Sequence, residues 1–432
     1  MTNLVVIDCH DLGRHLGCYG HASVPSPHLD ALASRGVRFA QSFCTAPQCS
    51  PSRATLYTGR YSHTNGMLGL AHDPFNWRLH ADEVHLAAYL RDAGYETAHV
   101  GIQHVTAWDA DAVRALGFEH AWQGHDDTAQ VVADAVGFLS RDHPRPFFLN
   151  IGFFDPHRDH TGGFTLSPPD DSLGVDIPSY LPATPEARRE CAALQGAIRT
   201  LDNAVGAIWR ALEANRLVDD TWFVFTTDHG LAMPRAKCTM YDPGLEAALL
   251  MIAPALGLQG GRVINEMISH VDFVPTALDG LGLPLPKRLH GWSYWPLLQG
   301  REYQPREHIF ASKTYHTAYE PQRAIRSARH KLILNLEVDI INVPADIQHS
   351  PIYPQMIDTL TRERPQVELY DLRDDPGETQ NLAGLAAAEA IERDLLDSLL
   401  DWMRVTDDPI LRGPISSPYY DKAMRILTGA GQ

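Results

Sequence analysis

Short apolar runs alternate with amphipathic stretches along the first 230 residues of the chain. The apolar runs, each bounded by turn residues, span 4–7, 97–100, 147–153 and 222–226, and the clearest amphipathic stretches span 84–93 and 190–212. Fully apolar runs of this length are typical of strands that are buried on both faces of a parallel sheet. The pattern therefore predicts a doubly wound, mostly parallel α/β sheet with helices on both faces.

The periodicity changes near residue 305. Beyond this point, 323–336 and 367–372 have the residue pattern of strands in a smaller sheet, and 386–404 has the pattern of a closing helix. We therefore expect two domains. A catalytic α/β domain is predicted over 1–305, and a smaller C-terminal α+β domain with an antiparallel sheet is predicted over 306–432.

Each of the four apolar runs is followed at once by polar residues that can take part in chemistry. The polar segments are 8–11, 101–104, 155–158 and 228–230. In a doubly wound sheet, active-site residues gather at the carboxyl ends of the strands. The sequence therefore predicts a single site to which all four segments contribute.

Composition narrows the class of protein. With 432 residues, of which 44% are hydrophobic and 21% charged, the chain is long enough for a large core and is typical of a folded enzyme. The net charge of −17 argues against nucleic acid or an anionic membrane surface as the main partner, because both select a basic face. No apolar run reaches the ~18 residues of a membrane span.

The expected compartment is the cytoplasm. The start of the sequence has no basic segment, long apolar stretch or cleavage site of the kind found in signal peptides. The six cysteines are scattered and show neither a zinc-binding spacing nor the framework of a disulfide-rich fold. This usage fits a reducing environment.

Cys49 begins the run CSPSR, which ends at Arg53 and is followed by ATLYTGR. This run resembles the sulfatase signature C-x-P-x-R, in which a maturation enzyme oxidises the cysteine to formylglycine. The resemblance implies a hydrated aldehyde, of which one hydroxyl attacks sulfur and the other expels sulfate. Arg53 lies one helical turn after Cys49 and is expected to steady this group, aided by the helix N-terminus. Without the resemblance, a small, partly buried thiol before a helix explains the run equally well.

Two further segments resemble the metal half-sites of sulfatases. In the segment 3–13, His10 and Asp11 stand where the family usually has an Asp-Asp pair. In the segment 222–230, Asp228 is followed by His229, which replaces the commoner Asn. The resemblance implies one divalent metal, calcium in most relatives. Each half-site here carries a carboxylate and an imidazole, a softer set than calcium prefers, so manganese or zinc also fits.

The first half-site also has a simpler explanation. Taken alone, a capping Asp with a hydrogen-bonding His after a strand accounts for His10 and Asp11. Asp8 lies one pleat before His10 on the same face of the strand. It is expected to be a partner of the ligands or a substitute ligand.

Three more residues gain a role from the resemblance. Lys237 matches the lysine that holds a sulfate oxygen, His104 matches the histidine that helps release sulfate, and His157 matches a histidine near the leaving group, a candidate general acid. Taken alone, a lysine is usually a solvated charge, and most of the 22 histidines are expected to be structural or exposed. Ile102 replaces a second sulfate-binding lysine of the family. We therefore expect Lys237, together with Arg158, to hold the anion.

The resemblance to sulfatases covers nearly the full chain, and several motifs are similar in particular to the heparan N-sulfatase (sulfamidase) branch. These motifs span 49–53, 62–70, 155–158 and 406–409. The resemblance implies an alkaline-phosphatase-like fold, a small anionic sulfated substrate such as N-sulfated glucosamine, and a formylglycine-generating enzyme as a partner. The number of chains in the assembly, a homo-oligomer included, stays open.

Two alternatives to a sulfatase remain from the sequence. A histidine at the motif position of His229 is also typical of phosphonate monoester and phosphodiester hydrolases on the same scaffold, which act on a different anion. The isoleucine at position 102 is compatible with a non-catalytic relative that only binds an anion.

Overall fold

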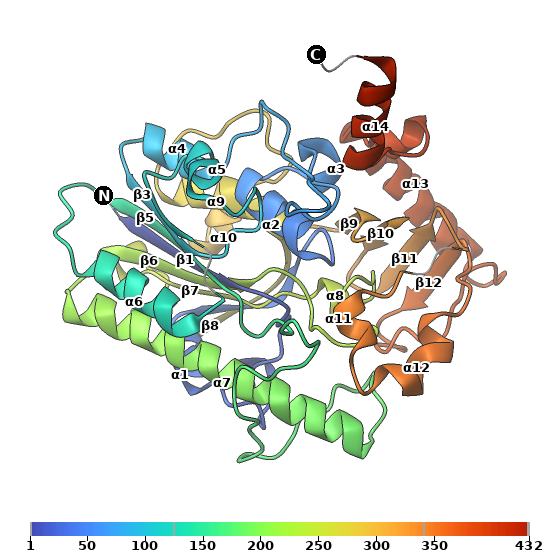
Figure 1. Ribbon diagram of the computed structural model, residues 1–432, viewed down its shortest axis with the longest axis horizontal. Coiled ribbons are helices and arrows are strands. Elements are labelled where there is room, and N and C mark those ends of the chain that lie inside the picture. Colours follow the sequence, from blue (N-terminus) through green and yellow to red (C-terminus); the bar gives the residue numbers. More distant parts are fainter. Residues whose placement is uncertain (1, 124–125, 340–341, 430–432) are drawn as a thin grey trace.

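The computed structural model describes residues 2–123, 126–339 and 342–429. Its larger sheet has eight strands in the order β4-β3-β5-β1-β6-β7-β2-β8 (Figure 1). Their bounds are β1 (Asn3–Cys9), β2 (Val37–Phe43), β3 (Glu96–Gly101), β4 (His120–Gln123), β5 (Phe147–Phe153), β6 (Thr221–Thr227), β7 (Leu249–Ile252) and β8 (Arg262–Ser269). Only β7 runs antiparallel to its neighbours, so the predicted mostly parallel sheet is confirmed.

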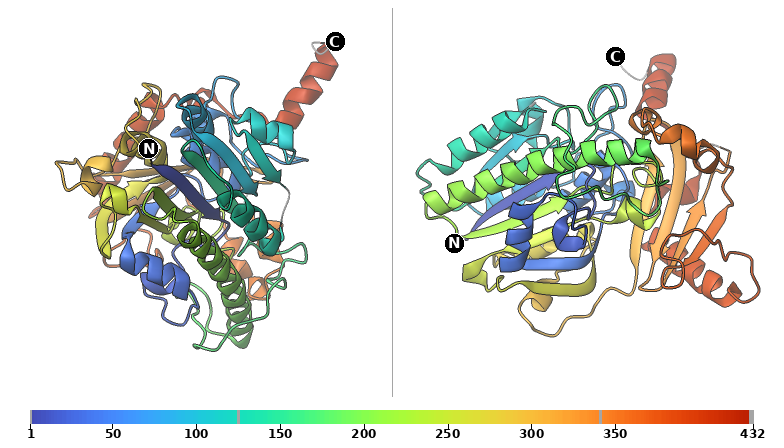
Figure 2. Two further views of the ribbon diagram at one scale, coloured as in Figure 1. Left: turned by 90° about the vertical axis from the view of Figure 1, so that its left-hand side faces the viewer. Right: turned by 90° about the horizontal axis from the view of Figure 1, so that it is seen from below.

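Helices cover both faces of this sheet, as predicted (Figures 1 and 2). One face packs against α1 (Pro27–Arg35), α6 (Thr128–Leu139) and α7 (Pro185–Ala214), and the other packs against α2 (Cys49–Thr58), α4 (Leu86–Asp92), α5 (Ala110–Ala115), α9 (Phe273–Gly280) and α10 (Trp295–Leu298).

Strand β1 shows how the sequence builds these two layers. Val5 and Ile7 belong to the core on the α7 side, Leu4 and Val6 belong to the core on the α2 side, and all four side chains are fully buried. Successive side chains of a strand point to opposite faces, so a strand that is covered on both faces must be apolar at every position. This requirement explains the unbroken apolar run in the sequence.

A second, four-stranded antiparallel sheet has the order β12-β11-β10-β9. Its strands are β9 (Ile309–Tyr315), β10 (Tyr319–Arg326), β11 (His330–Asn335) and β12 (Val367–Asp371), and the short or C-terminal helices are α3 (Ser62–Asn65), α8 (Asp242–Leu245), α11 (Ala345–Gln348), α12 (Tyr353–Leu360), α13 (Glu389–Val405) and α14 (Pro418–Thr428). The predicted strand region 323–336 is a hairpin formed by the end of β10 and all of β11. The predicted boundary at 305 lies between α10 and β9, and the division into two domains stays a prediction.

Helix α13 closes the second sheet as the sequence indicates. Leu395, Leu399 and Met403 recur every four residues along one side of the helix and pack in one cluster with Ile325 and Leu332 of the sheet. Residues four apart lie on the same helix face, so this spacing provides a continuous apolar stripe.

The carboxyl ends of the central strands point toward the second sheet, since the N-terminus marks the far end of β1 and β9–β12 lie at the opposite end of the molecule (Figure 1). At this edge, Gly101 ends β3 with φ +86°, and a Cβ there would lie 2.2 Å from the carbonyl oxygen of Gly152. Only glycine fits so close an approach. The chain therefore turns sharply and carries 102–104 across the sheet end.

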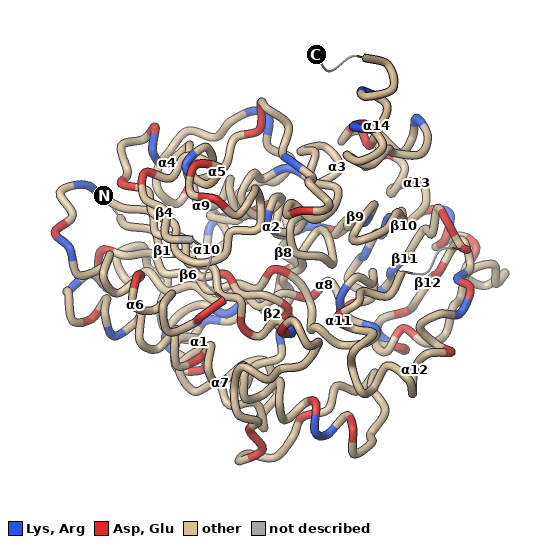
Figure 3. Tube along the Cα trace, in the orientation of Figure 1, with Lys and Arg blue, Asp and Glu red and all other residues tan. Residues whose placement is uncertain are grey.

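Charged residues are interspersed along the chain (Figure 3). Among the described residues, no helix combines the length and the apolar character that crossing a membrane requires.

Candidate active site

Cys49 is the first residue of α2 and lies at the carboxyl edge of the large sheet. Its side chain is buried, and its Sγ lies 3.4 Å from Nε2 of His229. Burial raises the pKa of the Cys49 thiol well above its usual value.

The two predicted metal half-sites meet beside Cys49. The backbone N–H of Asp11 donates to Oδ1 of Asp228 at 3.0 Å, and Nδ1 of His10 lies 3.0 Å from Oδ2 of the same carboxylate. Nε2 of His229 lies 3.1 Å from Oδ1 of Asp11. The side chains of all four residues are buried. Strands β1 and β6 are hydrogen-bonded neighbours, which is why residues more than 200 positions apart come together.

Asp8 is the counter-ion of Arg53. Its carboxylate accepts hydrogen bonds from the Arg53 guanidinium and the Tyr57 hydroxyl, and from Nδ2 of Asn150 at 2.9 Å. Of the two roles expected for Asp8, these contacts fit that of a partner of the ligands, because Arg53 joins its carboxylate to that of Asp228. Arg53 also donates through Nε to Oδ2 of Asp228 at 3.2 Å, so it links α2 to both β1 and β6.

Lys237 is buried between three partners. Its Nζ lies 2.7 Å from Oδ2 of Asp11, 2.8 Å from Oδ2 of Asp346 and 3.0 Å from Nε2 of His157. Burial alone lowers the pKa of Lys237, but the carboxylates of Asp11 and Asp346 outweigh it and hold the pKa well above its usual value. Asp346 belongs to α11 and lies outside every sequence motif, so no sequence signal indicated its place in the site.

Two histidines flank this cluster. Nδ1 of His157 lies 2.5 Å from the carbonyl oxygen of Arg158, so Nδ1 carries the proton and Nε2 accepts from Lys237. His104 has a left-handed backbone, with φ +59°, and its ring lies 5.4 Å from the ring of His10. Burial lowers the pKa of both histidines, and Lys237 adds to the effect at His157.

His72 was missed by the sequence analysis. Its Nδ1 lies 3.0 Å from Nε2 of His104, and the two rings are stacked with their centroids 5.1 Å apart. It lies in an irregular segment without a motif, so only the fold reveals it. The structure thus brings together all nine residues expected in the site: His10, Asp11, Cys49, Arg53, His104, His157, Asp228, His229 and Lys237.

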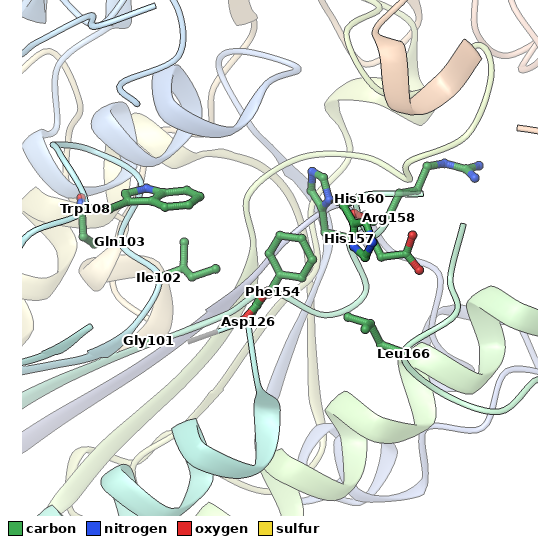
Figure 4. Close-up of a pocket in the computed structure, with 11 residues that line it drawn as sticks. Gly101, Ile102, Gln103, Trp108, Asp126, Phe154, His157, Arg158, His160 and Leu166 are labelled. Carbon is green, nitrogen blue, oxygen red and sulfur yellow. Dashed lines mark hydrogen bonds between the residues drawn. The ribbon is translucent and has the colours of Figure 1, made fainter. Parts of the chain in front are cut away.

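A cavity of about 370 Å³ opens beside these residues (Figure 4). Ile102 and Trp108 lie on one side of it, Leu166 and His157 lie on the other, and Phe154 lies between them. The rest of the lining is formed by Gly101, Gln103, Asp126, Arg158, Asp159 and His160. Four of the side chains around the cavity, those of Ile102, Trp108, Phe154 and Leu166, are apolar or aromatic and form one part of its wall.

The sequence analysis expected Arg158 to hold the anion together with Lys237, and the structure contradicts this expectation. Its guanidinium is buried, points away from the cavity in Figure 4, and forms an ion pair with Glu190 at 2.5 Å. It also donates to the carbonyl oxygens of Ala232 at 2.7 Å and Gly162 at 2.9 Å. These partners fix the guanidinium in the scaffold, so it is not available to a substrate.

The sequence places the chain in a known family. Residues 2–283 match the family described as Sulfatase, and residues 229–404 match the C-terminal region described as N-sulphoglucosamine sulphohydrolase, C-terminal. The chain belongs to the sulfatase family, which confirms the resemblance drawn from the motifs. The chain is therefore a hydrolase of sulfate esters or sulfamates.

Three relatives illustrate the range of the family. N-sulphoglucosamine sulphohydrolase of Homo sapiens is 30% identical over 95% of this chain and 92% of its own length. A solved 2-O GAG sulfatase has a TM-score of 0.75 at 21% identity and covers 96% of this chain and 95% of its own. The phosphonate monoester hydrolase of Agrobacterium radiobacter has a TM-score of 0.70 at 21% identity, with 94% and 96% covered. The two structural likenesses show a shared fold.

Proposed function

We propose that this sulfatase uses a formylglycine formed from Cys49 together with one divalent cation. The observation that carries the proposal is the position of Cys49, which begins a buried helix and faces His229 at 3.4 Å inside the cluster of carboxylates and imidazoles. Hydrated formylglycine at this position would supply a gem-diol. One hydroxyl would bond to sulfur as the bond from sulfur to the leaving group breaks, and deprotonation of the other would re-form the aldehyde and release sulfate. All six cysteines are free, which supports the reducing, cytoplasmic compartment that we propose.

The residues around Cys49 fit a metal ion. Nδ1 of His229 lies 3.0 Å from the carbonyl oxygen of Gly230 and therefore carries the proton, so Nε2 presents a lone pair. That lone pair lies 3.1 Å from Oδ1 of Asp11, a carboxylate oxygen without a hydrogen-bond donor. Two buried acceptors at this distance repel one another unless a cation, either a metal ion or a proton on Nε2, lies between them. This geometry supports a shared divalent ion.

The balance of charge supports the same conclusion. Four carboxylates and two cations make up the charged part of the site: Asp8, Asp11, Asp228 and Asp346 with Arg53 and Lys237. A substrate sulfate would add more negative charge. Asp11, Asp228 and His229 would hold the ion, with His10 as a ligand or neighbour, and the ion would supply charge neutralisation and a template for the sulfate oxygens. Calcium fits by family, and the imidazoles also suit manganese or zinc.

The protein groups can handle the protons of the reaction. Nδ1 of His104 is buried without a partner, so the neutral ring can accept a proton from a hydroxyl at residue 49. At the leaving-group side, His157 accepts from the Lys237 ammonium at 3.0 Å. We infer that the proton for the leaving group comes from this pair, and that Arg53 and the helix N-terminus stabilise negative charge at residue 49.

Substitution of Cys49 tests the nucleophile. Cys49→Ala and Cys49→Ser should both abolish sulfate release, because neither side chain can form a gem-diol, while the fold is retained. Intact mass around residue 49, measured after co-expression with a formylglycine-generating enzyme, should show conversion in the wild type. More than trace activity in the alanine variant would contradict the mechanism. Faster turnover of an aryl phosphonate than of an aryl sulfate would instead favour the phosphonate hydrolase alternative.

Removal of a ligand tests the metal. Asp228→Asn should lose about one equivalent of bound divalent metal, measured by elemental analysis, because it replaces a charged oxygen ligand with a neutral amide. Asp346→Asn is the matched control, since Asp346 contacts Lys237 and lies outside the ligand cluster. Equal metal content in Asp228→Asn and the wild type would show that the ion lies elsewhere.

Lys237 is proposed to hold the anion because Ile102 leaves the neighbouring position without a charge. A sulfate oxygen bound there would replace one of the three acceptors that now face Nζ of Lys237. Lys237→Ala should lower kcat/KM at least tenfold, a loss of about 1.4 kcal/mol of transition-state binding. The Ki of inorganic sulfate should rise in parallel. Unchanged values of kcat/KM and Ki would show that the anion is held by other groups.

The cavity beside the site is proposed to receive the leaving group. Several of its polar side chains are already committed: Oε1 of Gln103 accepts the backbone N–H of Thr106 at 2.9 Å, and the Asp159 carboxylate accepts the backbone N–H groups of Thr161 at 2.8 Å and Thr165 at 2.9 Å. Asp126, His157 and His160 also line the cavity, while Ile102, Trp108, Phe154 and Leu166 give it an apolar wall. We infer that the cavity binds a leaving group through an apolar face.

Trp108 is the side chain to test for this contact, because it is 56% exposed and its removal leaves the core intact. Trp108→Ala should lower kcat/KM for an aryl sulfate about tenfold, through loss of about 1.4 kcal/mol of apolar contact. The Ki of inorganic sulfate should stay unchanged, because sulfate has no leaving group. A parallel change in both constants would place Trp108 at the anion instead.

A further inference from the structure

A second cluster of metal-ligating residues lies outside the proposed catalytic site. His15 and His21 belong to the segment between β1 and α1, and Asp176 belongs to the segment between β5 and α7. Nδ1 of His21 lies 3.2 Å from Oδ1 of Asp176, and Nδ1 of His15 lies 4.0 Å from the same oxygen. One ligand atom from each residue can be chosen so that all three lie within 4.8 Å of one another. We propose that this cluster binds Zn²⁺ or a similar divalent transition metal.

His15 brings a buried imidazole to the cluster. Its ring is only 3% exposed, and the nitrogen that faces Asp176 is Nδ1, at 4.0 Å from Oδ1. This distance is too long for a hydrogen bond, whereas two ligands on opposite sides of one zinc ion lie about this far apart.

The arrangement of the three side chains favours an ion over a purely structural contact. The two imidazole rings lie with their centroids 4.4 Å apart, and both direct Nδ1 toward one carboxylate oxygen of Asp176. Only His21 is close enough to that oxygen for a hydrogen bond, so the second imidazole has no proton-mediated link to it. A metal that displaces the proton between His21 and Asp176 would engage both rings at once.

The ligand set indicates the class of metal. Two imidazole nitrogens and one carboxylate oxygen are a common zinc set, with water in the remaining position. Calcium instead takes six to eight oxygen ligands, which this cluster does not offer. The side chains of His21 and Asp176 are 34% and 26% exposed, so the ion can enter from solvent on that side.

The bound ion would join two segments that lead from the catalytic strands. His15 lies four residues after Asp11, and Asp176 lies in the long segment that begins with the His157 region. The backbone N–H of Asp176 also donates to Oε1 of Gln195 in α7 at 2.8 Å. The ion would therefore clamp the segment after β1 to the α7 side of the molecule and should raise the Tm through binding to the folded state.

The test compares Zn²⁺ uptake by the wild type with uptake by His21→Ala and Asp176→Asn. Each variant should bind one equivalent of Zn²⁺ less than the wild type in equilibrium dialysis, since both keep every residue of the proposed catalytic metal site. His28→Ala is the matched control, because His28 lies seven residues after His21 and outside the cluster. With Co²⁺ as the probe, the visible d–d bands of the wild type should be reduced in the two cluster variants and retained in the control.

Two measurements keep the result clear. His21 and Asp176 are partly exposed, so both variants should fold, which circular dichroism and the rate of aryl sulfate hydrolysis would verify. Zn²⁺ should raise the Tm of the wild type by more than that of either variant. Equal Zn²⁺ stoichiometry in the wild type and both variants, or an equal shift in Tm, would overturn the proposal. Because uptake is measured without turnover, this outcome is independent of the formylglycine mechanism.

Discussion

The structure depends on one buried carboxylate, that of Asp228. Its Oδ1 accepts the backbone N–H groups of Asp11 at 3.0 Å and of His229 at 2.8 Å, and its Oδ2 accepts Nε of Arg53 at 3.2 Å and faces Nδ1 of His10 at 3.0 Å. These partners come from the ends of β1 and β6 and from α2. A buried charge is tolerated only when it is paired and hydrogen-bonded. The hydrogen bonds to the Asp228 carboxylate therefore fix the arrangement of β1, β6 and α2. Because Cys49 begins α2, they also fix the position of Cys49.

The second sheet region completes the site through its own buried charge pairs. Lys237, which follows the second half-site, reaches Asp346 of α11 at 2.8 Å, so the catalytic edge and the C-terminal region share a cation. Within that region, Arg323 donates to both oxygens of Asp408, at 2.5 and 2.8 Å. Breaking a buried pair costs about 3–5 kcal/mol because one charge is left without a partner. Such pairs set the register between segments that are far apart in the sequence.

The sequence analysis succeeded where one local rule decides the outcome. The runs 4–7 and 147–153 were identified as strands because a strand covered on both faces must be apolar at every position, and Cys49 and Arg53 were placed on one helix because they lie one turn apart. The rule that active-site residues gather at the carboxyl ends of parallel strands also predicted that the strand-end residues lie at one edge of the sheet.

The parts that the sequence did not reveal depend on contacts between distant segments. Asp346 enters the site through a short helix with no motif, and His72 through the stack it forms with His104. The expected role of Arg158 failed for the same reason, because its partner Glu190 lies on α7 and no local pattern shows which way the guanidinium turns. For Asp8 the sequence left two roles open, and the contact that relates it to the ligands, through Arg53 to Asp228, is again one between distant segments.

The main chain and the side chain of Ile102 contact different parts of the proposed site. The backbone carbonyl of Ile102 accepts a hydrogen bond from Nη1 of Arg53 at 3.2 Å, so its main chain helps to hold the guanidinium in the proposed catalytic cluster. Its side chain lines the cavity beside Phe154 and Trp108 (Figure 4). An apolar side chain at this place leaves the positive charge on Lys237 and Arg53, deeper in the site, and keeps the cavity wall apolar. A sulfated substrate is therefore expected to bind with its anion toward these two cations and with an apolar face of its leaving group toward the cavity wall.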